Sequence, residues 1–382
     1  MFWAKKLIPR PVFAFFQPIY HYKMALLAAL IYRFPSRKIK VIAVTGTKGK
    51  SSVVEIVNAI LEEAGYKTAV AGTIRYKIGE KSERNLYKMT IPGRFFVQRF
   101  LRQAVNAGCE YLNAKLAIAR EMERSPKKPR AIIANIDDKE GGKFLTADVE
   151  RKVPFSIHSA ENLKEGNGCV EFDWAGEHFS SKLPGKFNVY NILAAASFAK
   201  AIGIPTETIA TAVKKITGIR GRAQFIRGGQ SFDAIVDYAH TPDSLRALYE
   251  AFSAPRQSSG PKRKLICVLG NTGGGRDKWK RPEMGRIADQ YCDEIILTNE
   301  DPYDEDPRQI LKEMEAGITK HRPEIILDRR EAIAVAVKKA SAGDAVLITG
   351  KGTDPYIMGT NGSREPWDDA TVIREEISKL IN

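Results

Sequence analysis

A glycine-containing loop between an apolar strand and a helix is the strongest chemical signal in this chain. The loop and its flanks, residues 41–52, read VIAVTGTKGKSS. Gly46 and Gly49 permit a tight turn whose backbone N–H groups can converge on an anion. The Lys50 ammonium can reach the outer phosphates of a nucleoside triphosphate, and the Ser51 hydroxyl can ligate Mg²⁺. The residues predicted to bind ATP here are Gly46, Thr47, Lys48, Gly49, Lys50, Ser51 and Ser52, and Ser51 is the predicted metal ligand.

The elements that must position this loop fit the same interpretation. The strand before it, Val41–Thr45, is apolar without alternation, as in a parallel sheet covered on both faces. A helix predicted over Ser52–Ala64 would present the positive end of its dipole to the phosphates. Val44 departs from the general phosphate-loop pattern, because a glycine is expected there. Further strands are predicted over 67–72 and 131–134, and further helices over 95–107, 113–124 and 189–201.

Four polar loops follow predicted strands in the C-terminal part of the chain. Strands predicted over 234–236, 265–269, 294–298, 324–327 and 345–349 alternate with helical segments, which is typical of a doubly wound sheet. The polar loops lie at 237–242, 270–278, 299–303 and 350–354. Ligands of open parallel sheets bind at the carboxyl ends of the strands, so we expect these loops to converge on one crevice.

Composition narrows the class of protein. The chain has 382 residues, enough for two or three domains, and a formal net charge of +15. No basic run is interleaved with aromatic residues, so nucleic acid is not an expected partner. The four cysteines are scattered without metal-ligand spacing, and we expect reduced thiols and a cytoplasmic protein.

The first 39 residues form a distinct aromatic and basic segment. The apolar run Met24–Tyr32 is too short to span a bilayer, and no small-residue cleavage site follows it. Two interpretations stay open. The segment is either a helical hairpin packed on the next domain or an interfacial helix that contacts a membrane surface.

The order of four motifs resembles that of the Mur ligase family. The motifs are the loop at 46–52, LPGKFNVYN at 183–191, the dipeptide at 221–222 and the loop at 237–242. Within this family, the loops at 273–281 and 350–352 are most similar to the UDP-N-acetylmuramoyl-tripeptide synthetase branch. The resemblance implies an α/β protein with a P-loop central ATPase domain followed by a C-terminal doubly wound, Rossmann-like domain. The corresponding divisions are 1–39, 40–220 and 221–382.

The resemblance also implies a reaction. ATP phosphorylates a carboxylate, the amine of an amino acid attacks the acyl phosphate, and phosphate leaves. The expected substrates are a UDP-muramoyl-peptide-like acceptor and lysine or diaminopimelate, in peptidoglycan biosynthesis, with ATP and Mg²⁺ as cofactors. A monomer is expected. Two alternatives stay open, namely another ligase of the family (folylpolyglutamate-like or poly-amino-acid) and a non-catalytic nucleotide-binding subunit.

Family similarity assigns roles to further residues around the nucleotide and the acceptor. Residues expected near ATP are Asn188, Asn191, Arg222, Asp237 and His240. The loop containing Thr90, Pro92 and Gly93 is expected to contact the muramoyl-peptide. Lys115, placed on a predicted helix, matches the position of a carbamylated lysine, whose carbamate oxygens could bind a second Mg²⁺. Lys50, Lys115, Arg222 and Arg276 are the expected catalytic residues.

Other residues are expected to bind the amino acid. Arg276 would pair with its carboxylate. Asp301, Tyr303, Gly352 and Asp354 complete the expected substrate set, with Asp354 able to hold an ammonium group. Diaminopimelate enzymes of this branch have arginine where Tyr303 stands, and residues 300–306 are strongly acidic. This combination favours an amino acid with a cationic side chain, such as lysine.

Two departures from the family pattern stand out. The N-terminal UDP-binding domain of the family does not precede the phosphate loop. The chain also passes directly from Tyr111 to Leu112, where the family has several dozen residues, including a strand with a Mg²⁺-binding glutamate and a loop with a Mg²⁺-binding histidine. Loss of that central strand is expected to expose a sheet edge or break the sheet.

Overall fold

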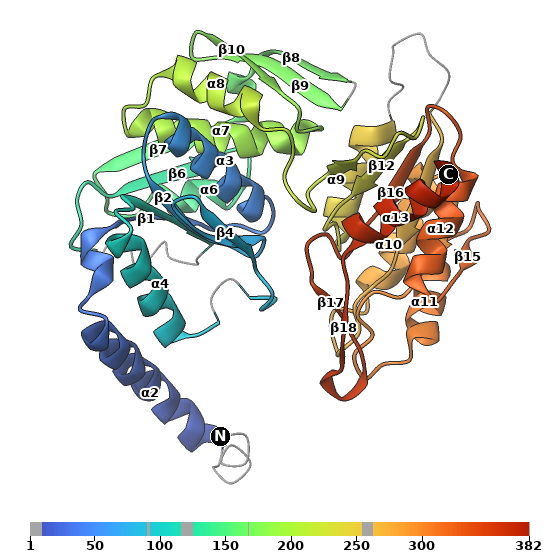
Figure 1. The fold of residues 1–382 in the computed structure, drawn as a ribbon, viewed down its shortest axis with the longest axis horizontal. Coiled ribbons are helices and arrows are strands. Elements are labelled where there is room, and N and C mark those ends of the chain that lie inside the picture. Colours follow the sequence, from blue (N-terminus) through green and yellow to red (C-terminus); the bar gives the residue numbers. More distant parts are fainter. Residues whose placement is uncertain (1–9, 90–91, 116–124, 167, 254–262, 382) are drawn as a thin grey trace. The chain divides into compact units, whose positions relative to one another are not determined.

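The computed structural model of the chain describes residues 10–89, 92–166, 168–253 and 263–381, apart from 116–124. It divides into two compact units (Figure 1). Unit 1 comprises Met1–Thr45 and Ala64–Ala117, and unit 2 comprises Gly46–Glu63 and Ile118–Asn382. The three-part division expected from the sequence stays a prediction.

Unit 1 is built on a five-stranded sheet in the order β1-β5-β2-β3-β4. Strand β5 pairs in parallel with β1 and with β2, whereas β2, β3 and β4 follow one another as antiparallel neighbours. The strands are β1 (Lys40–Val44), β2 (Thr68–Ala71), β3 (Arg75–Ile78), β4 (Lys81–Arg84) and β5 (Tyr111–Lys115). The strands expected at 41–45 and 67–72 are therefore confirmed.

The prediction for the segment after Tyr111 was wrong. Residues Tyr111–Lys115 form strand β5 between β1 and β2, where a helix was expected to begin at Asn113, and the sheet is not broken. Residues 116–124 of the predicted helix lie outside the described residues. The physical reason is tertiary: β1 and β2 offer unpaired backbone groups on both sides, and five residues of extended chain satisfy them. The side chain of Asn113 is fully buried there, and its amide has no hydrogen-bond partner among the described residues.

One long helix makes up most of the described part of the N-terminal segment, and the helical hairpin expected there stays a prediction because residues 1–9 lie outside the described residues. Helix α2 (Arg10–Ile31) is followed by the short η1 (Pro35–Lys38), and α4 (Arg94–Asn106) packs against both. The guanidinium of Arg102 in α4 donates to the carbonyl oxygens of Tyr32 (from Nε, 2.8 Å) and Arg33 (2.9 Å), which closes the C-terminal end of α2. No helix among the residues described is long and apolar enough to cross a membrane.

The first part of unit 2 is a helical layer with two small sheets. Helix α3 packs on α7 and α8. Strands β6 and β7 pair in parallel, which confirms the strand expected at 131–134, and β8, β9 and β10 form an antiparallel sheet. The bounds are α3 (Lys50–Glu63), β6 (Ala131–Asn135), α6 (Gly141–Phe144), β7 (Arg151–Phe155), η2 (Ile157–Ser159), β8 (Glu161–Gly166), β9 (Cys169–Trp174), β10 (Glu177–Ser181), α7 (Lys186–Ala201) and α8 (Thr206–Lys215).

The rest of unit 2 is a doubly wound α/β layer structure, as predicted. Its six-stranded sheet has the order β11-β12-β16-β13-β14-β15, with only β11 antiparallel. Alternate residues of the strands feed two apolar clusters, one on each face. The strands are β11 (Gln224–Ile226), β12 (Asp233–Val236), β13 (Leu265–Leu269), β14 (Glu294–Leu297), β15 (Glu324–Ile325) and β16 (Ala345–Ile348).

Helices cover both faces of this sheet (Figure 1). Side chains of α9, α10 and α11 enter one apolar cluster, and those of α12 and α13 enter the other. The helices are α9 (Pro242–Ser253), α10 (Lys280–Tyr291), α11 (Pro307–Glu315), α12 (Arg329–Lys339) and α13 (Asp369–Ile381); a small hairpin of β17 (Tyr356–Met358) and β18 (Arg364–Pro366) encloses η3 (Thr360–Gly362).

The expectation of four reduced cysteines was also wrong. Cys267 in β13 and Cys292, directly after α10, form a disulfide, while Cys109 and Cys169 remain thiols. The two bonded residues are 25 positions apart in sequence, so their spacing gave no sign of pairing. They meet because the strand and the helix contribute side chains to the same apolar cluster.

Candidate functional site

The phosphate loop has the backbone geometry that its glycines predict. It connects the end of β1 to the first residue of α3, so the predicted order of strand, loop and helix is confirmed. Gly46 has φ +136° and Gly49 has φ +74°, both in the region that favours glycine. A side chain at Gly49 would also clash, because its Cβ would lie 2.2 Å from Oδ1 of Asn191.

Lys50 folds back over the loop that precedes it. Its Nζ donates to the carbonyl oxygens of Thr47, at 3.1 Å, and Gly46. Ser51 lies in the first turn of α3, where its hydroxyl is 3.5 Å from Nη2 of Arg222. An ammonium, a hydroxyl and a guanidinium thus surround the N-terminus of a helix, which is a suitable environment for phosphate groups.

Two asparagines of α7 are linked to each other, and one of them lies against this loop. Asn188 donates from Nδ2 to the carbonyl oxygen of Pro184 at 2.8 Å, and Asn191 donates to Oδ1 of Asn188 at 3.0 Å. Both side chains are buried. The structure therefore places Asn191 beside Gly49, and contact of either residue with the nucleotide base stays a prediction.

Asp237 holds together the segment that carries Arg222. It follows β12 directly, and its carboxylate accepts the N–H groups of Ala223 and Ala239, both at 2.6 Å. Burial raises the pKa of Asp237, and the nearby Arg222 guanidinium works against that rise. Arg222 itself lies over the ring of Tyr238, 4.5 Å from its centroid.

His240 has partners that fix its position. Its Nδ1 is 2.8 Å from the carbonyl oxygen of Tyr238, and its own carbonyl oxygen accepts a hydrogen bond from Nζ of Lys280 at 3.2 Å. Burial lowers the pKa of Lys280, which is only 7% exposed. Lys280 was not among the residues predicted from the sequence. Its position in the first turn of a helix, directly after a polar loop, was a signal for a site residue.

Lys48 differs from the other loop residues. Its ammonium forms an exposed ion pair with Asp243, at 2.8 Å, in the first turn of α9. Exposed pairs contribute little to stability. Lys48 is nevertheless part of the predicted phosphate loop, and its contact with ATP stays a prediction.

The loop predicted to bind the amino acid is organised by ion pairs. Glu305 accepts the N–H of Gly275 at 2.9 Å and contacts the cations of Arg281, at 3.0 Å, and Lys278, at 3.2 Å. The side chain of Arg281 is fully buried and also pairs with Glu313 at 2.7 Å. Exposed Arg276 is the next residue after Gly275, so its loop is fixed by contacts that sequence analysis did not anticipate.

The acidic stretch 300–306 is largely engaged within the protein. Asp301 accepts hydrogen bonds from Nζ of buried Lys351 and from the N–H of Met358, both at 2.7 Å. Glu300 is 3% exposed, accepts the Thr272 hydroxyl at 2.9 Å and has a second oxygen, Oε2, without a partner among the described residues. These contacts leave less negative charge for a substrate than the sequence suggested.

Three further predicted residues of this region have defined backbone positions. Tyr303 has a left-handed φ of +51°, and its N–H donates to the carbonyl oxygen of Met358 at 3.1 Å. Gly352 has φ +51°, and a Cβ there would lie 2.7 Å from Cβ of Tyr238. The N–H of Asp354 donates to the carbonyl oxygen of Lys351 at 2.8 Å. Gly352 therefore brings the fourth polar loop against the first.

The predicted acceptor residues belong to unit 1. Gly93 directly precedes α4 in extended backbone, with Pro92 before it, whereas Thr90 lies outside the described residues. Lys115 is the last residue of β5 and is not helical, which corrects its predicted setting. Its carbamylation stays a prediction.

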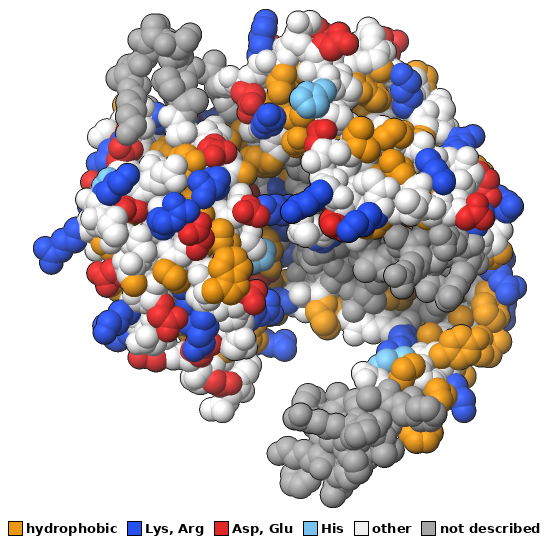
Figure 2. Space-filling view, turned by 180° about the vertical axis from the view of Figure 1, so that it is seen from behind, with side chains coloured by type: hydrophobic (Ala, Val, Ile, Leu, Met, Phe, Trp, Pro, Cys, Tyr) orange, Lys and Arg blue, Asp and Glu red, His pale blue; other side chains and the backbone are white. Residues whose placement is uncertain are grey.

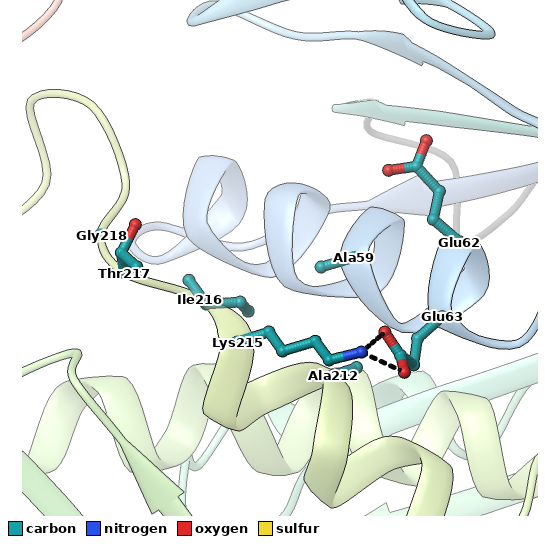
Figure 3. A pocket seen from close by; sticks show the side chains of 8 residues that line it. All are labelled: Ala59, Glu62, Glu63, Ala212, Lys215, Ile216, Thr217 and Gly218. Atoms are coloured by element: carbon teal, nitrogen blue, oxygen red, sulfur yellow. Dashed lines mark hydrogen bonds and ion pairs between the residues drawn. The ribbon is translucent and has the colours of Figure 1, made fainter.

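A separate hollow of about 440 Å³ lies away from these residues (Figure 3). It is bounded by the C-terminal half of α3, the end of α8 and residues 216–218. In this view Lys215 and Glu63 face each other, and Nζ lies 2.7 Å from Oε1. No residue of the predicted site lines it, so we assign it no ligand.

The residues around the phosphate loop fit a nucleotide, and a second metal ion at Lys115 stays a prediction. Ser51 and Lys50 form a set suited to a triphosphate with one Mg²⁺. Within the described parts of the chain, no group of three or more histidine, cysteine, aspartate or glutamate side chains could hold a metal ion.

Comparison with known proteins identifies the family. The sequence matches the Mur ligase middle domain over residues 44–113 and 108–199, and the Mur ligase glutamate ligase domain over 221–352. The chain belongs to the Mur ligase family. A curated Mur ligase from Geobacillus kaustophilus, named UDP-N-acetylmuramoyl-L-alanyl-D-glutamate–2,6-diaminopimelate ligase, is 34% identical, with 93% of this chain and 82% of the relative covered. A ligase of the same name from Listeria monocytogenes is 30% identical, with 87% and 77% covered.

Solved structures agree with this assignment of the Mur ligase fold. The structure of a UDP-N-acetylmuramoyl-L-alanyl-D-glutamate–2,6-diaminopimelate ligase aligns with a TM-score of 0.59 at 26% identity, covering 92% of this chain and 82% of the other. A folylpolyglutamate synthase from Mycobacterium tuberculosis aligns with a TM-score of 0.66 at 15% identity, covering 86% and 91%, which supports the fold alone.

The alignments also locate a difference between this Mur ligase and its relatives. The alignment with the Geobacillus protein is 409 positions long, more than the 382 residues of this chain, so the relative carries residues that this chain lacks. The match to the middle domain is interrupted and resumes around residues 108–113. This is the place where the sequence passes from Tyr111 directly to Leu112.

Proposed function

We propose that this Mur ligase forms an amide bond between a muramoyl-peptide carboxylate and an amino acid, using ATP, in peptidoglycan precursor synthesis. The observation that carries the proposal is the loop 46–52, with Lys50 over its carbonyl groups and Asn191 against Gly49. Relatives at 34% identity are named as ligases that add 2,6-diaminopimelate to UDP-N-acetylmuramoyl-L-alanyl-D-glutamate.

The nucleotide would be held by groups that the structure brings together. Lys50 would exchange its bonds to Thr47 and Gly46 for phosphate oxygens, and Arg222 would reach the same phosphates from beside Ser51. The Ser51 hydroxyl would ligate the Mg²⁺ that accompanies ATP, and this ion would neutralise charge on the transferred phosphoryl group. The chain's own contribution is to position the phosphates and to neutralise their charge.

The amino acid would lie at the loop that contains Arg276. Its carboxylate would pair with the exposed guanidinium, while Glu305 and Arg281 fix the loop behind it. Diaminopimelate and lysine both remain candidates. Asp301 is already paired with Lys351, so the acidic stretch supports lysine as the added amino acid less strongly than its sequence suggested. The named relatives favour diaminopimelate as the added amino acid.

A second candidate function rests on the interrupted middle domain. The family model matches in two parts that meet at residues 108–113, the alignment with the Geobacillus relative is longer than this chain, and residues 111–115 form strand β5. A protein of this kind could bind ATP without turning it over. The two candidates share the nucleotide site and differ in whether phosphate is released.

The setting that we propose is a cytoplasmic monomer that uses ATP with Mg²⁺ and contacts a membrane surface through residues 1–39. We expect the acceptor to resemble a UDP-muramoyl-peptide, because the named relatives act on such a compound.

The test measures ATP binding and phosphate release by the intact chain in parallel. Phosphate release is followed with ATP, Mg²⁺ and a UDP-muramoyl-dipeptide, with lysine, diaminopimelate, glutamate or alanine added in turn. A ligase releases phosphate only when the acceptor and its own amino acid are both present. ATP binding without release under any of these conditions would support the non-catalytic alternative.

Two variants define the nucleotide site in the same assays. Lys50→Ala is expected to weaken ATP binding at least about tenfold, since it removes a charge-assisted phosphate contact. Lys182→Ala, which removes an exposed lysine after β10, is the control and should bind as the parent does. Unchanged ATP affinity of Lys50→Ala, with an unchanged melting temperature, would refute the nucleotide site and both candidate functions.

A further inference from the structure

Helix α2 exposes its bulky apolar side chains to the outside of unit 1. Figure 2 shows apolar side chains gathered along this helix. Tyr22 is 70% exposed, Leu30 is 54% exposed and Ile31 is 58% exposed. Five more large apolar residues of the helix are also exposed, namely Phe16, Ile19, Tyr20, Leu26 and Leu27. A helix of a soluble domain normally turns such residues towards the core.

A different set of residues forms the more buried side of α2. Ala28 is fully buried, and His21, Met24 and Ala25 are half-buried. These residues recur at spacings of three and four, so they share one face of the helix. Helix α2 packs against α4 within unit 1. The more buried side of α2 thus includes two alanines, while most of its large apolar side chains are exposed.

The charge around this face has one sign. No aspartate or glutamate occurs before Glu55, whereas the first 40 residues contain eight lysines and arginines. Arg33, Arg37 and Lys38, at the C-terminal end of α2, are all exposed. Cations that flank an exposed apolar helix favour an anionic bilayer surface, which attracts each of them.

The attachment of α2 leaves the face accessible within unit 1. Arg102 of α4 donates to the carbonyl oxygens of Tyr32 and Arg33, so the helix is fixed at its C-terminal end. In Figure 1 the helix extends away from α4 towards its N-terminal end. Tyr20 and Tyr22 carry a polar hydroxyl on an apolar ring, which suits the headgroup region.

We propose that α2 is an interfacial membrane anchor that lies on an anionic lipid surface with its exposed apolar side. Leu26, Leu27, Leu30 and Ile31 enter the boundary between headgroups and acyl chains. Arg33, Arg37 and Lys38 contact the anionic headgroups. The helix does not cross the bilayer, and its binding is independent of the proposed ligase activity.

The test is co-sedimentation of the full chain with vesicles. Vesicles of phosphatidylcholine alone are compared with vesicles that also contain phosphatidylglycerol, at low and at high salt. We expect binding to the anionic vesicles that weakens as salt increases, because the electrostatic part is screened. Absence of binding, or equal binding to both kinds of vesicle, would overturn the proposal.

Two pairs of variants separate the apolar and the charged contributions. Leu27→Glu with Leu30→Glu should weaken binding at least about tenfold, and Arg37→Glu with Lys38→Glu should do the same. The matched controls are Ile325→Glu with Leu380→Glu, at similarly exposed apolar positions, and Lys182→Glu with Lys338→Glu. Because the charge variants alter exposed residues only, they test the proposal even if the leucine variants misfold.

Light scattering of the same samples tests the main competing occupant, a second copy of this chain. We expect the parent mass to be independent of concentration when no vesicles are present. The membrane proposal would be overturned by two results together: the parent chain forms a dimer and does not sediment with anionic vesicles, and the Leu27→Glu, Leu30→Glu double variant is monomeric. The apolar face would then be assigned to self-association.

Discussion

The carboxylate of Asp301 and the ammonium of Lys351 form a buried ion pair with an Oδ1–Nζ distance of 2.7 Å. The side chains are 6% and 1% exposed. Asp301 also accepts the N–H of Met358, so the pair joins the loops after β14 and β16 to strand β17. Two residues from separate polar loops are therefore bound to each other.

Breaking this pair should destabilise the protein strongly. Lys351→Met leaves the Asp301 carboxylate buried without its cation, and we expect a loss of about 3–5 kcal/mol in the free energy of unfolding. Urea unfolding measures it. The comparison is Lys81→Met, at the exposed pair with Glu83, which should cost at most about 1 kcal/mol. Similar losses in the two variants would contradict the buried pair.

Asn113 offers the opposite case, a substitution that should stabilise. Its amide is buried in β5, an interior strand, without a partner among the described residues, which costs the desolvation free energy of a polar group. Asn113→Leu should therefore raise the free energy of unfolding by about 1–3 kcal/mol. Asn106→Leu, at an exposed position, is the control and should change it by less than about 0.5 kcal/mol. A destabilised Asn113→Leu would show that the amide has a partner or that β5 lies elsewhere.

Glu305 should contribute to the pH dependence of stability. The N–H of Gly275, together with the cations of Arg281 and Lys278, lowers the pKa of Glu305 to about 2. Because an unfolded glutamate has a pKa near 4.3, the contribution is present above about pH 4.3 and is lost as the pH falls towards 2. Glu305→Gln should flatten this part of the stability curve, by up to about 3 kcal/mol.

Urea unfolding over this pH range measures the effect. Glu365→Gln, which removes an exposed carboxylate in β18, should leave the slope unchanged. An identical slope in Glu305→Gln and the parent would count against the cation and N–H contacts of Glu305. Since these contacts hold the loop of Arg276, Glu305→Gln should also raise the KM for the amino acid.

The disulfide should be visible in both mass and stability. Alkylation under denaturing conditions should label two cysteines before reduction and four after it. The bond closes a loop of 25 residues, and its reduction should lower the free energy of unfolding by about 3–4 kcal/mol. The melting temperature of Cys267→Ala with Cys292→Ala should not respond to reductant. Four labelled cysteines without reduction would contradict the bond.

Local sequence determined most of the elements and the chemistry of the phosphate loop. The apolar run before Gly46 and the helix after it follow from patterns that operate within a few residues, and β1 and α3 confirm them. The five core strands of the C-terminal sheet were predicted for the same reason, because buried parallel strands are continuous apolar runs. The family followed from several such motifs in a fixed order, and the comparisons confirm it.

Tertiary structure alone decided the remaining features. Residues 111–115 are a strand because β1 and β2 pair with them from both sides, although a helix was predicted from Asn113 onward. Cys267 meets Cys292, and Asp301 meets Lys351, across separations of 25 and 50 residues. Charge counted along a chain does not reveal which acids are already neutralised, because partners distant in sequence are brought together only when the sheet and its loops assemble.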